Sequence, residues 1–68
     1  GVYFQSYDSV IVFENNGGEH SQPRTYLDEV YWNYSRTTSK YRNQFLGETT
    51  EETKKKINDG TYKLVNLN

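Results

Sequence analysis

The chain has no cysteine, no methionine, one proline and one histidine among its 68 residues. Without cysteine there is no disulfide, no thiolate nucleophile and no Cys-based zinc or redox site. The lone His20 lies beside residues 17–18, both glycine, in a segment that would not hold a catalytic base in fixed geometry. We therefore predict that the protein is not an enzyme and uses no metal or cofactor.

Long hydrophobic runs are also missing. The longest covers residues 10–13, whereas a membrane-spanning helix needs about 20 apolar residues. Hydrophobic residues make up 32% of the chain, and its mean hydropathy of −1.05 is typical of disorder. The aromatic content of 16% indicates folding instead, because disordered segments are poor in aromatics. We predict one small cytoplasmic domain over residues 1–68, with no membrane partner, and interpret Gly1 as a cloning remnant.

Charge is divided unevenly along the chain, although the formal total is only −1. Residues 1–34 carry five acidic residues and one basic residue, a net charge of −4. Residues 35–68 carry seven basic and four acidic residues, a net charge of +3. Such a dipole can orient a partner, but it is far from the strongly basic balance of a dedicated nucleic-acid binder.

The first half of the chain has the alternating pattern of strands. Residues 2–14 predict one strand and residues 24–32 a second. Between them, residues 15–23 are rich in Asn and Gly and end in Pro23, which favours a loop. The simplest arrangement is an antiparallel hairpin with a long tip.

The second half has helical periodicity. Ser35 or Thr37 can cap a helix over residues 36–46, and Gly47 can end it in a left-handed conformation. Residues in and just before this helix recur at spacings of three or four and predict one buried stripe, which Leu46 can extend: Tyr34, Thr38, Tyr41 and Phe45.

A capping box of Thr49 and Glu52 begins a second helix over residues 50–59, with Glu–Lys pairs four residues apart. Its one strongly apolar residue is Ile57, so we expect this helix to lie on the surface with few contacts. Residues 61–67 predict a last strand. The expected fold is α+β in the order β-β-α-α-β, a three-stranded antiparallel sheet with two short helices on one face.

Residues 31–45 are the main functional candidate, because they interleave aromatic with basic side chains. This set can anchor a protein interface, stack on nucleic-acid bases with phosphates held by the basic residues, or build the core of a small domain. We predict these partner-binding residues: Tyr31, Trp32, Tyr34, Arg36, Lys40 and Arg42. In this prediction Arg42 lies off the buried stripe, toward the basic face of the helix.

A second candidate is the sheet face that the helices leave open. A domain of this size cannot bury both faces, so we expect the open face to expose some of the following: Tyr3, Val10, Val12, Tyr26, Val30 and Trp32. Such a patch would bind a partner protein or be covered in a homodimer.

Two motifs resemble a known group of sequences. Residues 34–47, with the order Tyr-Ser-Arg-Thr-Thr-Ser-Lys at their start, and residues 59–64, Asp-Gly-Thr-Tyr-Lys-Leu, are similar to small proteins of phages and mobile elements from Gram-positive bacteria. The resemblance implies action in an infected or lysogenic cell by binding, and inhibiting, a host or defence protein, in an anti-CRISPR-like role. The alternative is a nucleic-acid-binding accessory protein that uses the basic helix.

Overall fold

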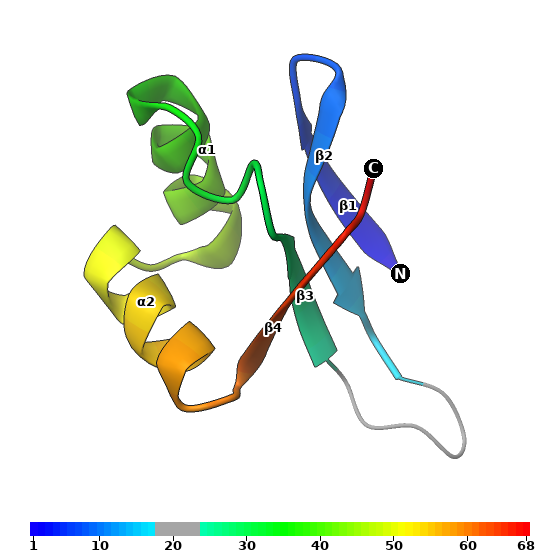
Figure 1. Cartoon of the computed structure of the whole chain (residues 1–68), viewed down its shortest axis with the longest axis vertical. Helices are drawn as coiled ribbons and strands as arrows, with labels where there is room; N and C mark the ends of the chain where they lie inside the picture. The colour runs from blue at the N-terminus through cyan, green and yellow to red at the C-terminus, as the bar shows by residue number, and fades with distance from the viewer. Residues whose placement is uncertain (18–23) are drawn as a thin grey trace.

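The computed structural model describes residues 1–17 and 24–68, and within them the chain forms four strands and two helices (Figure 1). These are β1 (Val2–Ser6), β2 (Ser9–Asn15), β3 (Arg24–Asp28), α1 (Arg36–Leu46), α2 (Thr50–Asn58) and β4 (Tyr62–Val65). The sheet order is β1-β2-β3-β4; β1–β2 and β2–β3 pair antiparallel, while β3–β4 pair parallel. Both helices lie on the same side of the sheet (Figure 1). The α+β class and the two helices are confirmed; the three-stranded, wholly antiparallel sheet is corrected to four mixed strands.

The extra strand arises because the predicted strand over residues 2–14 folds back at Tyr7 and Asp8. Ser6 pairs with Ser9, which leaves a two-residue hairpin turn. Tyr7 takes a left-handed backbone conformation with φ of 56°, as the first position of a tight hairpin turn requires. Tyr7 and Asp8 continue the alternation of polar and apolar residues in the flanking strands, so the sequence pattern does not indicate the turn. The second predicted strand is shorter than expected and ends at Asp28; most of the predicted loop, including His20, lies outside the described residues.

A β-bulge shapes the core. Phe4 pairs with Val12 and Gln5 with Val10, so Ile11 is an extra residue in β2. Ile11 and Val12 are both buried as a result, and with Leu27 and Tyr62 they form the core. The partly buried residues packed against it are Phe4, Tyr31, Trp32, Phe45, Leu46 and Ile57. Ile57 thus packs against the core, while most of α2 is exposed, as expected for a helix on the surface.

The opposite face of the sheet carries a row of aromatic rings. Tyr3, Phe13 and Tyr26 are register partners on adjacent strands, with ring centroids 4.6 Å and 6.1 Å apart. Tyr3 is exposed, as expected for an open face, whereas Val12 belongs to the core and Trp32 is half-buried beside it. Tyr3 and Tyr26 therefore lie on this open face. Val12 belongs to the core, and Trp32 packs against the core.

The helix ends follow local signals in the sequence. The Ser35 hydroxyl accepts the Thr38 backbone N–H at 3.1 Å, and Gly47, with φ of 68°, donates its N–H to the Asn43 carbonyl at 2.8 Å. Thr49 and Glu52 form the reciprocal capping box that begins α2. These capping predictions are confirmed. In α2, however, Lys56 pairs with Glu48 at 3.1 Å in place of Glu52.

The buried stripe of α1 differs from the predicted one. Thr38 is buried, and Phe45 stacks on Phe4 with centroids 5.5 Å apart, but Tyr41 is 48% exposed. Arg42 is fully buried in its place. Positions 38, 42 and 45 also follow helical spacing, so periodicity alone does not distinguish the two stripes. Neither helix in the described part of the chain is long and apolar enough to span a bilayer.

Candidate functional site

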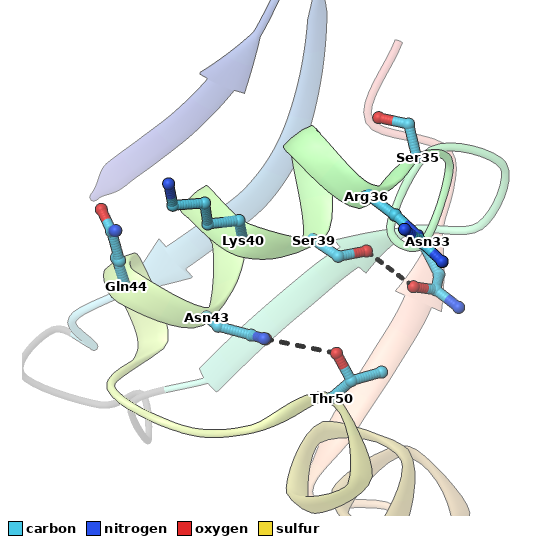
Figure 2. Close-up of a pocket in the computed structure, with 8 residues that line it drawn as sticks. All are labelled: Asn33, Ser35, Arg36, Ser39, Lys40, Asn43, Gln44 and Thr50. Carbon is cyan, nitrogen blue, oxygen red and sulfur yellow. Dashed lines mark hydrogen bonds between the residues drawn. The ribbon is translucent and has the colours of Figure 1, made fainter.

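A shallow groove of about 690 Å³ runs along α1 (Figure 2). The turn before α1, three turns of the helix and the first residue of α2 provide the polar side chains that line it. They are Asn33, Ser35, Arg36, Ser39, Lys40, Asn43, Gln44 and Thr50. We call this surface the α1 groove; its lining contains two cations, amides and hydroxyls, and no carboxylate.

Arg42 lies fully buried among residues that line the α1 groove. Its Nη1 donates to the Trp32 carbonyl oxygen and, at 3.3 Å, to Asn33 Oδ1. Its Nη2 donates to Asn43 Oδ1 at 3.0 Å and to Thr50 Oγ1 at 2.8 Å. The guanidinium carbon is also 5.3 Å from the centroid of the Trp32 ring, within the range of a cation–π contact. The side chain thus joins the turn before α1 to the start of α2.

The charge of Arg42 has no ion-pair partner in residues 1–17 and 24–68, where the ion pairs are Lys54–Glu51 and Lys56–Glu48. Its buried Nε also lacks a hydrogen-bond acceptor there. Burial lowers the pKa of Arg42, and the charge of Glu48 opposes that shift. An arginine stays protonated at neutral pH in such surroundings. A positive charge thus lies buried among the residues that line the groove, hydrogen-bonded only to neutral oxygen atoms in the described part of the chain and offset by the charge of Glu48 beyond ion-pair distance.

A smaller cleft of about 240 Å³ adjoins the groove at the start of α1. Three tyrosines, Tyr7, Tyr31 and Tyr34, line it with Asp8 and Thr38. Tyr7 is 76% and Tyr34 67% exposed, and the rings of Tyr31 and Tyr34 meet edge to face with centroids 5.4 Å apart. We call this surface the tyrosine cleft. Tyr34 of the cleft directly precedes Ser35 of the α1 groove, so both surfaces include residues at the N-terminal end of α1.

Asp28 positions the turn that supplies Tyr31. Its Oδ2 accepts the backbone N–H groups of Val30 and Tyr31 at 3.0 and 2.9 Å, and its Oδ1 accepts from Leu67 and Asn68. Burial alone would raise the pKa of Asp28, but these four hydrogen bonds together lower it below its ordinary value. The ionised carboxylate therefore fixes both the turn and the C-terminal tail.

A second buried charge, Glu48, lies between α2 and β4. Its carboxylate accepts from Lys56 Nζ at 3.1 Å, Thr53 Oγ1 at 3.0 Å and the Tyr62 hydroxyl, and its side chain is 4% exposed. Burial on its own raises the pKa of Glu48, whereas the three side-chain hydrogen bonds together lower it. Burial and the bond to Glu48 raise the pKa of Tyr62 to about 12. This charge is fully partnered within the chain.

The structure divides the six predicted binding residues into three pairs. Tyr31 and Tyr34 line the tyrosine cleft, and Arg36 and Lys40 line the α1 groove. Trp32 and Arg42 lie inside, so the prediction that Arg42 belongs to the exposed basic face is wrong. The physical reason is that four oxygen acceptors surround its guanidinium group.

Sequence reasoning missed Tyr7 and Asp8 in the cleft, and Asn33 and Thr50 in the groove. Two polar residues between alternating segments are compatible with a hairpin turn, which was the available signal for the first pair. Asn33 and Thr50 approach α1 only through tertiary packing, and no local pattern marks them.

The fold and these two surfaces define a small α+β domain with an aromatic cleft and a groove that carries two cations. A model described as a family of unknown function, DUF8033, matches residues 1–60, and the chain belongs to that family. No curated protein and no solved structure is significantly similar to the chain.

Proposed function

We propose that the protein acts by binding another protein through the tyrosine cleft and the adjoining α1 groove. The observation that carries this proposal is the convergence of Tyr7, Tyr31 and Tyr34, from two separate segments, on one cleft. Tyr7 presents its ring from a left-handed backbone conformation, which costs a residue other than glycine about 1–2 kcal/mol. Strain of this kind concentrates at functional positions.

Aromatic and basic side chains have complementary roles in such a surface. Exposed tyrosines give large apolar contact at low cost in conformational entropy and are frequent energetic hot spots. Arg36 and Lys40, both exposed at the neighbouring groove, would orient an acidic partner and speed association. Tyr34 and Arg36 are therefore the central residues of the proposal.

We further propose that the partner is a bacterial host or defence protein and that binding inhibits it. The support for this part is the resemblance of residues 34–47 and 59–64 to small phage and mobile-element proteins. The proposed setting is the cytoplasm of an infected or lysogenic cell.

Affinity capture from a bacterial lysate tests the proposal, with immobilised wild type, Tyr34→Ala and Tyr41→Ala compared side by side. Tyr41 is the matched control, since it is an exposed tyrosine that does not line the cleft. We expect Tyr34→Ala to weaken capture of a specific protein about 30-fold, the effect of a hot-spot residue of about 2 kcal/mol. Tyr41→Ala should capture as wild type does. Equal recovery by all three proteins would refute the role of the cleft.

Tyr7→Gly provides a second variant, and this substitution should leave the fold intact. Glycine adopts positive φ freely, so the substitution relieves strain at this position. We expect a fold as stable as wild type or more so, together with weaker capture. Retained capture would remove Tyr7 from the binding surface.

Nucleic-acid binding through the α1 groove is the second candidate function. It is favoured by Arg36 and Lys40 in a groove whose lining holds no carboxylate. A phosphate binder shows affinity that falls linearly with the logarithm of salt concentration. Failure to shift any single- or double-stranded oligonucleotide at low salt would eliminate this candidate.

A further inference from the structure

We infer that the α1 groove receives the carboxylate side chains of a short acidic segment of the partner protein, and that Arg42 is a positioning residue for that segment. The inference rests on the proposed function and specifies the chemistry of the partner. It is carried by the buried charge of Arg42, which forms no ion pair within residues 1–17 and 24–68, and by the donor groups that this charge arranges.

The first step concerns charge balance. The four Nη hydrogen bonds of Arg42 all end on neutral oxygen atoms, two from backbone or hydroxyl groups and two from amides. Its Nε has no acceptor in the part of the chain that the structure describes. Burying a cation costs several kcal/mol unless an anion compensates it. A carboxylate bound in the groove above would supply the missing compensation.

The second step concerns which groups face a ligand. Asn33 Oδ1 accepts from Ser39 Oγ at 2.8 Å as well as from Arg42, as Figure 2 shows for Ser39, and Asn43 Oδ1 accepts from Arg42. With its oxygen atom occupied, the Asn33 amide offers its N–H groups to a bound molecule, whereas Asn43 Nδ2 donates one N–H to Thr50 Oγ1 at 3.3 Å and keeps the other for a ligand. Arg42 thereby makes the polar lining a set of donors, which suits an anion.

The third step concerns the exposed cations of the groove. Arg36 and Lys40 are four residues apart on α1 and extend from the same side of the helix (Figure 2). Neither pairs with a carboxylate within residues 1–17 and 24–68. Two exposed cations and one buried cation therefore act on the same groove.

The fourth step separates an acidic peptide from a nucleic acid. At the end of the groove near Thr50, the first turn of α2 exposes Glu51 and Glu52. A phosphodiester strand carries charge at every nucleotide and would extend toward these carboxylates. A short acidic segment places its charge only where Arg36 and Lys40 lie, which favours the peptide.

An NMR titration of the full chain with N-acetylated hexaglutamate tests the inference, with hexaglutamine as the uncharged control peptide. We expect saturable shifts of the Asn33 and Asn43 side-chain amides and of the Arg42 Nε–H signal with hexaglutamate, and none with hexaglutamine. The Nε–H signal separates positioning from a merely structural role, because the fold is unchanged during the titration.

Two charge-matched double variants complete the test. Arg36→Gln/Lys40→Gln should weaken hexaglutamate binding about tenfold, because it removes the exposed cations of the groove. Lys54→Gln/Lys63→Gln removes the same charge away from the groove and should bind within about twofold of wild type. Equal weakening by both variants would show that net charge alone explains the effect, and it would overturn the inference.

A titration with decathymidylate supplies the remaining outcome. Tighter binding of decathymidylate than of hexaglutamate at the same groove residues would overturn the assignment to carboxylates. Absence of saturable shifts with hexaglutamate would do the same. Capture that depends on Tyr34 does not require the acidic peptide to bind, so this inference and the proposed function fail independently.

Discussion

Two of the buried charges in the described residues, those of Glu48 and Arg42, differ in how they are compensated. Glu48 accepts hydrogen bonds from Lys56, Thr53 and Tyr62, so its negative charge is matched by a nearby cation. Arg42 is buried as fully but donates only to neutral oxygen atoms. The first cluster joins α2 to β4 and is complete within the fold. The second leaves positive charge beneath a surface groove.

This difference separates a structural charge from one available to a ligand. A carboxylate with its own ammonium partner gains little from an outside ion. A guanidinium group held by amides and hydroxyls still attracts an anion bound nearby, because low-dielectric surroundings screen its charge weakly. The Glu48 cluster thus serves stability, whereas we propose that Arg42 serves both stability and recognition.

Replacing Arg42 tests the difference with the largest expected effect. Arg42→Met retains much of the side-chain volume but removes the donor of four hydrogen bonds, which leaves the Trp32 carbonyl and Asn43 Oδ1 without a donor among those bonds. We expect a loss of about 3 kcal/mol in the free energy of unfolding, measured by urea titration. Lys40→Met, an exposed control on the same helix, should change it by less than about 0.5 kcal/mol. A loss below about 1 kcal/mol for Arg42→Met would show that the guanidinium group contributes little to the fold.

Replacing Glu48 should have the next largest effect. Glu48→Gln keeps the shape of the side chain but removes the charge that Lys56 and Tyr62 contact. We expect about 2 kcal/mol of destabilisation in the same urea titrations. Glu51→Gln is the control, since Glu51 is exposed and makes only a 3.9 Å ion pair. If Glu48→Gln and Glu51→Gln lower the free energy of unfolding equally, the charge of Glu48 does not stabilise the fold.

The pH dependence sharpens the same contrast. The pKa of Glu48 lies below its ordinary value of 4.5 in the folded chain, so its stabilisation is complete above that value and is lost as pH falls through the folded pKa. Wild type and Glu48→Gln should therefore differ by a constant amount above pH 4.5 and draw closer in stability as the pH falls below that value. Asp28, whose pKa is also lowered, leaves a residual acid sensitivity in both proteins. A gap that stays constant as the pH falls below 4.5 would contradict the assignment.

The smallest expected effect is that of the exposed cations on stability. Arg36→Gln/Lys40→Gln should shift the free energy of unfolding by less than about 0.5 kcal/mol, since both side chains are exposed and unpaired within the described residues. Thermal unfolding with and without hexaglutamate provides the measurement. The peptide should raise the melting temperature of wild type and leave that of the double variant nearly unchanged. A large loss of stability in the double variant without peptide would show that Arg36 and Lys40 stabilise the fold.

Much of the local structure could be predicted from the sequence. Ser35, Gly47 and the Thr49–Glu52 box mark the helix ends because each cap depends on residues within one helical turn. These features require no knowledge of distant segments.

The remaining features depend on contacts between distant segments. The burial of Arg42 depends on acceptors from Trp32 and Thr50, at opposite ends of α1. Tyr41 is exposed because Arg42, one position along the helix, takes the buried position. The hairpin turn at Tyr7 continues the strand alternation, and the parallel pairing of β4 leaves no local mark. Arg42 was therefore assigned to the surface, where charged residues usually lie, although its spacing in the helix also fits a buried position.

The parallel pairing of β3 with β4 has a consequence for the order in which the chain folds. A two-residue turn joins β1 to β2, whereas residues 29–61, including both helices, separate β3 from β4. Closing the longer segment costs more chain entropy before any contact repays it. We therefore expect the β1–β2 hairpin and the helices to form early and β4 to dock last. Because Tyr62 belongs to β4, the same late step completes both the core and the hydrogen bonds around Glu48.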